Sequence, residues 1–217
     1  MLERILPPQV AAAEQFAGDE RGGGRGEVLF PGEQAAVARA VDRRRQEFAA
    51  GRACARAALA GLGLPPAPIL CGERGAPQWP AGVAGSITHC DGYRAAAVAR
   101  TSDLASLGVD AEPDQPLPAG VLDMISTAPE RARLAGLARP AGPAAPAAPP
   151  VSWDRLLFSG KEAVYKAWFP LARRWLDFGQ ADLTIGPRHE AGPPVPGSAP
   201  VTAGQAPVTA VTGGTAV

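Results

Sequence analysis

Two lysines, Lys161 and Lys166, lie five positions apart and are the only lysines in a chain of 217 residues. The other 19 of the 21 basic residues are arginines. Because an ammonium is a compact point charge and a guanidinium a planar fork, a lysine in such a chain indicates a site that faces a single oxygen. An ordinary helix pair between Glu162 and Lys166, worth about 0.3 kcal/mol, explains the same spacing. The two lysines alone do not distinguish a chemical site from an ordinary ion pair, so other residues must decide.

Two carboxylates, Asp110 and Glu112, stand two positions apart at the end of a predicted strand, Leu104–Glu112. Positions i and i+2 of a strand face the same side, where two carboxylates repel each other unless a cation or solvent lies between them. Oxygen ligands favour Mg²⁺ or Mn²⁺, and Mg²⁺ combines one or two carboxylates with water and phosphate oxygens. A solvated strand end before Pro113 is the alternative, and both readings stay open.

A third carboxylate lies on a long predicted helix that begins at a Ser152 cap and runs to Phe169, with Pro170 as its stop. Ser159, Glu162 and Lys166 share one face of this helix. If that face meets the strand end, three carboxylates for a metal and one ammonium for a phosphate come together. Such a set suits phosphoryl transfer.

Upstream, Arg44 and Arg52 are eight positions apart on an arginine-rich helix, and Arg56 follows one turn later. Arginines can grip a terminal phosphate with two hydrogen bonds, although an exposed helix face also carries them for solvation. His89 ends a predicted strand and either contacts phosphate or is structural.

The remaining pattern predicts an α+β protein, because a hairpin comes first and a long helix later. The prediction includes two helices within Glu33–Leu62 that end near Gly63, a Cys90–Gly92 hairpin turn and further elements. The further elements are strands at Val83–His89, Tyr93–Arg100 and Asp182–Ile185, and helices at Leu117–Ser126 and Pro129–Leu137.

Three segments rich in Gly, Pro or Ala are predicted to lie outside the core. Arg21–Gly26 reads as a surface loop and Arg139–Pro150 as an extended insert. Residues 187–217 repeat an Ala-Pro-Val-Thr-Ala unit and are predicted to be mostly disordered.

Composition argues against several classes of protein. Twenty-one acidic residues balance the 21 basic ones, so no large electrostatic footprint for nucleic acid or an anionic membrane is expected. No run approaches the roughly 18 apolar residues that a membrane span needs, so we expect a cytoplasmic protein. Cys54, Cys71 and Cys90 have no Cys-x-x-Cys spacing and are expected to be reduced.

Four runs, in order, carry a resemblance to a known family: residues 75–80 (GAPQWP), 85–94 (GSITHCDGYR), 108–113 (GVDAEP) and 158–168 (FSGKEAVYKAW). Together they resemble the 4′-phosphopantetheinyl transferases, in particular the enterobactin/surfactin-synthetase activating type. The resemblance spans about residues 28–186.

The resemblance implies an α+β fold of two similar halves, about 1–105 and 106–186, related by a pseudo-twofold axis with the active site in the cleft between them. It implies a monomer that moves the phosphopantetheine arm of coenzyme A to a serine of an apo acyl or peptidyl carrier protein and releases adenosine 3′,5′-bisphosphate. This is holo-[acyl-carrier-protein] synthase activity, in the service of fatty acid, polyketide, siderophore or nonribosomal peptide assembly.

The resemblance also implies roles by motif position. The implied metal ligands for Mg²⁺ (or Mn²⁺) on the pyrophosphate are Asp110, Glu112 and Glu162. Lys166 would neutralise phosphate charge, and Glu162 is the candidate base for the carrier serine. The implied contacts to the 3′-phosphoadenosine group are Arg44, Arg52, Arg74, Gly75, Thr88 and His89.

Two departures from the family pattern stand out. Cys71 and Arg74 occupy a loop where relatives often carry a lysine, and no Trp, Tyr or Phe follows Phe178. A coenzyme A or nucleotide-binding protein without transferase activity is therefore an alternative. RNA binding through the 39–56 helix is a third possibility, against which the zero net charge weighs.

Overall fold

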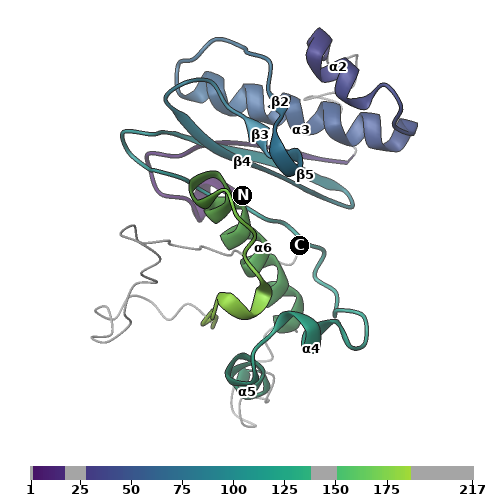
Figure 1. Cartoon of the computed structure of the whole chain (residues 1–217), viewed down its shortest axis with the longest axis vertical. Coiled ribbons are helices and arrows are strands. Elements are labelled where there is room, and N and C mark those ends of the chain that lie inside the picture. The colour runs from purple at the N-terminus through teal and green to yellow at the C-terminus, as the bar shows by residue number, and fades with distance from the viewer. Residues whose placement is uncertain (1, 18–27, 138–150, 187–217) are drawn as a thin grey trace.

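A computed structural model describes residues 2–17, 28–137 and 151–186. The predicted loop at 21–26, the 139–150 insert and the predicted disordered tail at 187–217 lie outside the described residues. Figure 1 shows helix α3 on one side of a small sheet and helix α6 on the other.

The sheet has three antiparallel strands in the order β1-β5-β4: β1 (Ala11–Phe16), β5 (Tyr93–Arg100) and β4 (Val83–Cys90). Strands β4 and β5 confirm the predicted hairpin, and Gly92 in its turn has φ +75°, which glycine adopts without strain. The pattern did not predict β1, which pairs with β5 from Ala11 opposite Val98 to Phe16 opposite Tyr93.

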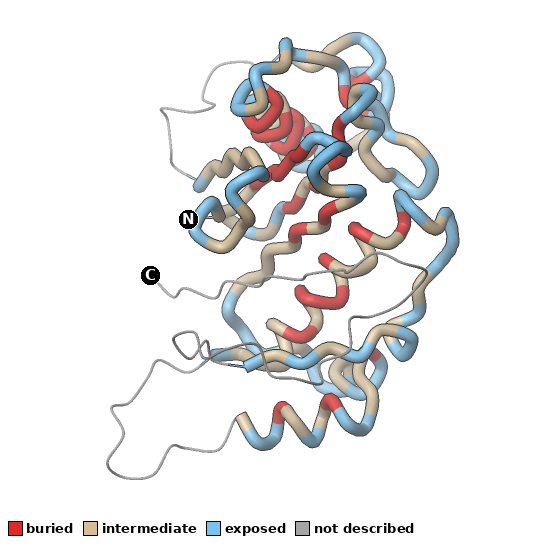
Figure 2. The backbone as a smooth tube through the Cα atoms, turned by 90° about the vertical axis from the view of Figure 1, so that its left-hand side faces the viewer, coloured by how far each residue is buried: buried red, intermediate tan, exposed pale blue. Residues whose placement is uncertain are grey.

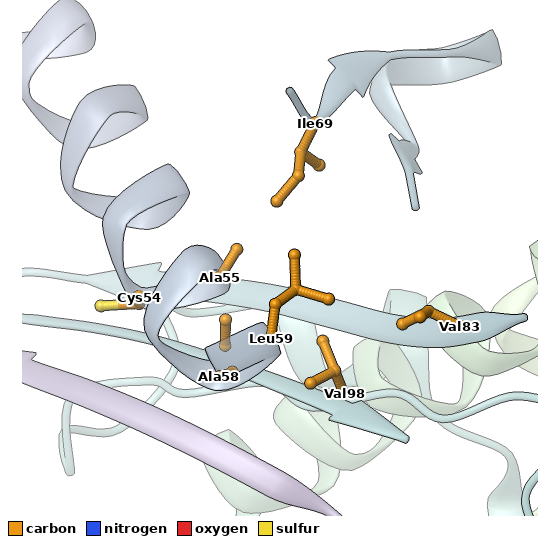
Figure 3. Packing of buried hydrophobic residues seen from close by; sticks show 8 residues of the cluster. Cys54, Ala55, Ala58, Leu59, Ile69, Val83 and Val98 are labelled. Carbon is orange, nitrogen blue, oxygen red and sulfur yellow. The ribbon is translucent and has the colours of Figure 1, made fainter. Parts of the chain in front are cut away.

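Helix α2 (Pro31–Val37) and helix α3 (Asp42–Gly61) confirm the two predicted helices, and the positive φ of Gly63 follows the end of α3. Small side chains let α3 approach the sheet closely. Figure 3 shows the packed residues, which are Cys54, Ala55, Ala58 and Leu59 on α3 with Ile69, Val83, Ala96 and Val98.

The opposite face of the sheet is covered by the segment that follows β5. Leu107 and Val109 pack on Ala97 and Ala99 there. The predicted strand at Leu104–Glu112 is wrong, because this segment joins no sheet. The hydroxyls of Ser86 and Thr88 on β4 accept hydrogen bonds from backbone N–H groups of this segment, where a neighbouring strand would otherwise supply carbonyl groups.

A short ribbon joins β2 (Leu70–Cys71) and β3 (Pro77–Gln78), and the turn η2 (Glu73–Gly75) connects them. A further short turn, η1 (Leu2–Arg4), precedes β1.

The C-terminal part consists of α4 (Val121–Ile125), α5 (Ala128–Leu137), α6 (Trp153–Ala172) and the turn η3 (Phe178–Gln180). Helix α5 confirms its prediction, whereas α4 is shorter than predicted. Pro170 lies inside α6, so the predicted stop at Pro170 is wrong.

The predicted strand at 182–185 is also wrong, because residues 181–186 have no regular structure. The N–H of Leu183 donates to the Glu130 carboxylate, and its carbonyl accepts from Arg133. Leu183 and Ile185 pack around Leu157 instead. Figure 2 shows buried positions along α6 as well as in the sheet and α3.

The mixture of helices and sheet confirms the α+β class. In the described residues the part after β5 contains no strand, so the pseudo-twofold relation of the halves stays a prediction. None of the described helices is long and apolar enough to cross a bilayer.

Candidate active site

A strip of chain at residues 106–112, here called the 106–112 strip, runs along α6 and carries two predicted metal ligands. Ser106 Oγ donates to the carbonyl of Ala167 at 2.8 Å. Gly108 lies so close that an added Cβ would stand 1.9 Å from the Ala163 carbonyl oxygen. Only glycine therefore permits this approach of the strip to the helix.

Two buried hydroxyls of β4 hold the strip from its other side. Ser86 Oγ accepts the N–H of Val109 at 3.1 Å. Thr88 Oγ1 accepts the N–H of Ala111 at 2.9 Å and donates to Asp110 Oδ1 at 3.3 Å. Thr88 therefore orients Asp110 in this structure, and its predicted contact with 3′-phosphoadenosine stays a prediction.

Asp110 and Lys166 meet where the strip passes over α6, as the sequence led us to expect. Lys166 Nζ donates to Asp110 Oδ1 at 2.7 Å and to the Val109 carbonyl at 3.2 Å. The other oxygen, Asp110 Oδ2, is buried and has no hydrogen-bond partner among the described residues. A buried carboxylate oxygen without a partner is costly, so this atom is suited to a cation.

Glu112 has a partner that the sequence reasoning missed. Arg155 donates to Glu112 Oε2 at 3.1 Å and to the carbonyls of Gln115 and Pro116 at 2.9 and 3.0 Å. One arginine among 19 gave no compositional signal. Its position seven residues before Glu162, two turns along the same helix face, was the available clue.

Glu162 interacts electrostatically with the two carboxylates of the strip, Asp110 and Glu112. Burial raises the pKa of Glu162, and repulsion from Asp110 and Glu112 adds to the rise against the opposing effect of Lys166. Burial also raises the pKa of Glu112, with repulsion from Asp110 added, although Arg155 opposes it. The three carboxylates are thus electrostatically coupled.

These carboxylates do not form a closed ligand set as they lie. Nowhere in the described ranges do three His, Cys, Asp or Glu side chains stand close enough to hold one metal ion. Asp110 contacts Lys166 and Glu112 contacts Arg155, so each has a cationic partner of its own. The open oxygen of Asp110 and the raised pKa values of Glu112 and Glu162 nevertheless fit a hard divalent cation such as Mg²⁺.

Arg44 and His89 form a second polar centre at the end of β4. Arg44 Nη1 lies 3.2 Å from His89 Nε2. Partial burial lowers the pKa of His89, and the nearby cations Arg44 and Lys166 act in the same direction, against Glu47. A bound anion would interact favourably with the Arg44 guanidinium and would favour the protonated form of His89.

Arg52 is not brought together with this centre. Its side chain is buried, stacks on the Phe48 ring at 4.1 Å and donates from Nε to the Ile69 carbonyl at 2.7 Å. Another donor lies 3.5 Å from Cys71 Sγ. The fully buried Glu33 accepts from the neighbouring Arg56 and also forms an ion pair with Arg52 at 4.0 Å. The predicted coenzyme A contact of Arg52 remains a prediction.

Arg74 and Gly75 both have left-handed backbones, with φ +53° and +79°. The Arg74 guanidinium lies 5.7 Å from the ring centre of Trp175. This contact links the β2–β3 ribbon to the segment after α6. It places both predicted coenzyme A residues near the C-terminal part of the site.

A pocket lies between α6 and the segment that follows it, and Glu162 is one of its lining residues. The helix contributes Lys161, Glu162 and Tyr165 to one wall, and Tyr165 stacks on Trp175 with ring centres 5.0 Å apart. The segment after α6 forms the other wall, with Trp175, Leu176, Asp177, Phe178 and Ala181. The pocket thus has aromatic and aliphatic walls and a carboxylate at one side.

Comparison with known sequences agrees with this geometry. Residues 32–99 match the profile of the 4′-phosphopantetheinyl transferase N-terminal domain, and residues 106–194 match that of the 4′-phosphopantetheinyl transferase superfamily.

Curated relatives give the same picture. The 4′-phosphopantetheinyl transferase Svp of Streptomyces mobaraensis is 60% identical over 162 residues, covering 74% of this chain and 62% of that protein. Npt of Nocardia iowensis is 48% identical over 187 residues (85% and 77%), and PptT of Mycobacterium tuberculosis is 53% identical over 156 residues (72% and 65%). The match therefore spans slightly less than two thirds of two of these relatives. From these similarities, the chain belongs to the 4′-phosphopantetheinyl transferase superfamily.

Proposed function

We propose that the protein transfers the 4′-phosphopantetheine arm of coenzyme A to a serine of an apo acyl or peptidyl carrier protein. The observation that carries the proposal is the contact of Asp110 with Lys166, at 2.7 Å, beside the coupled carboxylates Glu112 and Glu162. Charge of both signs is concentrated there, as transfer of a phosphoryl group requires.

The proposed reaction is a displacement at phosphorus. The serine oxygen attacks the phosphorus that bears pantetheine, and the bond from this phosphorus to the bridging oxygen of the pyrophosphate breaks. Adenosine 3′,5′-bisphosphate leaves with the bridging oxygen, and the serine proton passes to a base.

Glu162 is the proposed base, directly or through a water. Its raised pKa brings it closer to the pH at which it must accept a proton, which favours general base catalysis. Lys166 is placed to give a hydrogen bond to a phosphate oxygen once Asp110 has another cation to contact. Asp110, Glu112 and Glu162 would hold Mg²⁺, which when bound would neutralise charge on the pyrophosphate oxygens.

Coenzyme A would extend from the Arg44–His89 centre to the pocket beside Glu162. The two side chains of that centre suit the 3′-phosphate, and Arg74 and Gly75 lie near the C-terminal part of the site. The aromatic and aliphatic walls of the pocket suit part of the uncharged pantetheine arm, because its cavity volume is about 60 Å³.

Several further expectations belong to the same proposal. We propose holo-[acyl-carrier-protein] synthase activity with Mg²⁺ as the metal, a monomer in the cytoplasm, and one catalytic unit at residues 1–186 built from two similar halves. The pairing of Arg44 with His89, which lie on different elements of the first half, supports a site that needs the folded unit rather than one motif.

The test is transfer to a panel of apo carrier proteins with coenzyme A and Mg²⁺, followed by mass spectrometry. Modified carriers should gain about 340 Da, and Asp110→Ala should slow transfer at least about 100-fold. Asp123→Ala is the matched control, because Asp123 is 78% exposed and forms its described ion pair with Arg131 rather than with a residue of the site. Absence of any mass gain across acyl, polyketide and peptidyl carriers would refute the proposal.

A further inference from the structure

Lys161 is buried away from the phosphate-facing side of α6. Its side chain is 1% exposed, and Nζ donates to Glu130 Oε2 at 2.8 Å, to the Phe178 carbonyl at 2.6 Å and to the Ala181 carbonyl at 2.9 Å. An ammonium has three donors. All three are used within the protein, so none remains for a phosphate.

Glu130 is equally well fixed. Its carboxylate accepts the N–H of Thr127 at 2.7 Å while Thr127 Oγ1 accepts the N–H of Glu130 at 3.3 Å, which is a capping box at the start of α5. The other oxygen accepts the N–H of Leu183 at 2.8 Å. Burial opposes the charge of Glu130, but the bond from Lys161 and the two backbone bonds outweigh it and lower the pKa.

The acceptors of Lys161 belong to the pocket wall. Phe178 and Ala181 both line the pocket beside Glu162, and Lys161 itself lies on the helical wall opposite. Two bonds from one ammonium therefore tie the segment after α6 to the helix. Both bonds thus join one wall of the pocket to the other.

We propose that Lys161 and Glu130 are positioning residues that set the width of the pocket for the pantetheine arm, whereas Lys166 serves the phosphates. This inference rests on the proposed function, because the pocket is assigned to the arm of coenzyme A. It gives the two lysines of the chain separate tasks. Lys161 acts on the substrate only through the wall that it holds.

The main test is the double variant Lys161→Met with Glu130→Gln. It removes both charges, so neither is left unpaired, and the single glutamine oxygen can keep the capping-box bond from Thr127, although the amide NH2 cannot accept from Leu183. Binding is measured by calorimetry with two probes, coenzyme A and adenosine 3′,5′-bisphosphate, which lacks the arm. We expect the affinity for coenzyme A to fall about 10-fold and that for the bisphosphate to stay within about 2-fold.

Transfer kinetics give a second readout. KM for coenzyme A should rise about 10-fold with kcat within about 3-fold, since the removed interaction is uniform binding rather than transition-state stabilisation. Asp182→Asn is the control. Asp182 contacts Arg133 on the outside of the same segment and does not line the pocket, so neither probe should change.

Different failures are distinguishable. If the unaltered protein neither binds coenzyme A nor modifies a carrier, the proposed function fails first. Parallel loss of both probes in the double variant would identify Lys161 as a phosphate ligand, and unchanged coenzyme A binding would show that the pair does not set the pocket. Either result overturns the inference.

If the double variant shows no cooperative melting, Lys161→Arg replaces it. Arginine keeps the charge opposite Glu130, but its larger planar group cannot keep both carbonyl contacts at 2.6 and 2.9 Å. A loss of about 3-fold, confined to coenzyme A, supports the proposal, and equal effects on both probes contradict it.

Discussion

The two ends of the site differ in their exposure to water. The Arg44 side chain is 51% exposed and its contact with His89 lies at the surface. At the other end the Asp110 side chain is 8% exposed, and its partner Lys166 is 29% exposed. Exposed charges are screened and can adapt, whereas shielded charges interact strongly and tolerate little change. We infer that the surface end supplies affinity and the shielded end supplies chemistry.

That contrast predicts an order of effects, from substitutions along the shielded strip down to those at the surface. It would fail if a surface substitution at His89 harmed transfer more than a change at the strip.

The largest effect is expected for Gly108→Ala. The new Cβ would stand 1.9 Å from the Ala163 carbonyl oxygen and 2.8 Å from the Ala167 nitrogen, both backbone atoms that cannot move aside. We expect about 3 kcal/mol or more of destabilisation, a fall in Tm of at least about 6 °C and loss of transfer. The change in Tm is measured by thermal denaturation, with circular dichroism as the signal.

Gly136→Ala is the control for that substitution, since nothing lies within 4 Å of an added Cβ at Gly136 on α5. It should stabilise the protein by about 0.5–1 kcal/mol. A normal melting curve for Gly108→Ala would mean that the strip does not lie against α6 as described.

Lys166→Arg should come next. A guanidinium cannot replace the compact ammonium that reaches both Asp110 Oδ1 and the Val109 carbonyl. We expect kcat to fall about 10- to 100-fold with little change in Tm, measured as the rate of carrier modification. Near-normal activity would show that the scarcity of lysine in this chain does not reflect a chemical requirement.

Arg155→Met tests the part of the site that holds Glu112. Arg155 lowers the pKa of Glu112 against burial and the charge of Asp110, so its removal should raise that pKa further. Because the carboxylate must be ionised to bind metal, activity should be lost at a higher pH than in the unaltered protein as the pH falls. The Mg²⁺ concentration that gives half-maximal activity should rise about 10-fold in mildly acid buffer. In alkaline buffer it should equal that of the control.

The control for Arg155→Met is Arg100→Met, which removes an exposed arginine that bonds only the Leu62 carbonyl among the described contacts. Identical Mg²⁺ requirements for the two variants at every pH would contradict a role of Arg155 in placing Glu112.

The smallest effect is expected for His89→Gln. The pKa of His89 lies below its ordinary value, so the ring is neutral near pH 7, and a bound 3′-phosphate would raise the pKa. Affinity for coenzyme A should therefore increase about 3-fold as the pH falls from about 8 to about 6.5. The variant should lose this dependence and about 3- to 10-fold in affinity.

Dephospho-coenzyme A supplies the control for His89 because it has no 3′-phosphate. Its calorimetric affinity should show neither the pH dependence nor the loss in the variant. An equal loss for both ligands would assign His89 to another part of coenzyme A or to the fold.

The sequence predicts well those elements whose signals are local. The β4–β5 hairpin follows from the Cys90–Gly92 turn, and α3 follows from a long alanine-rich run. Strand β1 was missed because Ala11, Ala12 and Ala13 have low strand propensity, and pairing with β5 decides their conformation.

The incorrect strands share one physical cause. The apolar alternation at Leu107 and Val109 reflects packing on the sheet face, while Ser86 and Thr88 bond the backbone of the strip. Alternation reports which side is buried and does not report whether a neighbouring strand supplies the hydrogen bonds.

The candidate site divides in the same way. Helix periodicity put Glu162 and Lys166 on one face, and the family resemblance put Asp110 in the same site before the structure was known. Arg155 and Glu130 could not be placed in this way, because neither residue lies in the four family motifs and no periodicity pairs them with Glu112 and Lys161. The left-handed backbone of Arg74 likewise has no signature in the sequence.

The 106–112 strip begins where the second of the two family profiles begins, so residues 100–105 connect the matched ranges 32–99 and 106–194. A cut within residues 101–105 would leave the carboxylates on one fragment and the hydroxyls of Ser86 and Thr88 that orient the strip on the other. Each fragment alone would then lack an ordered acidic centre. Reassembly of the two fragments would restore it, so this junction offers a place at which transfer activity can be made to report the association of two fused proteins.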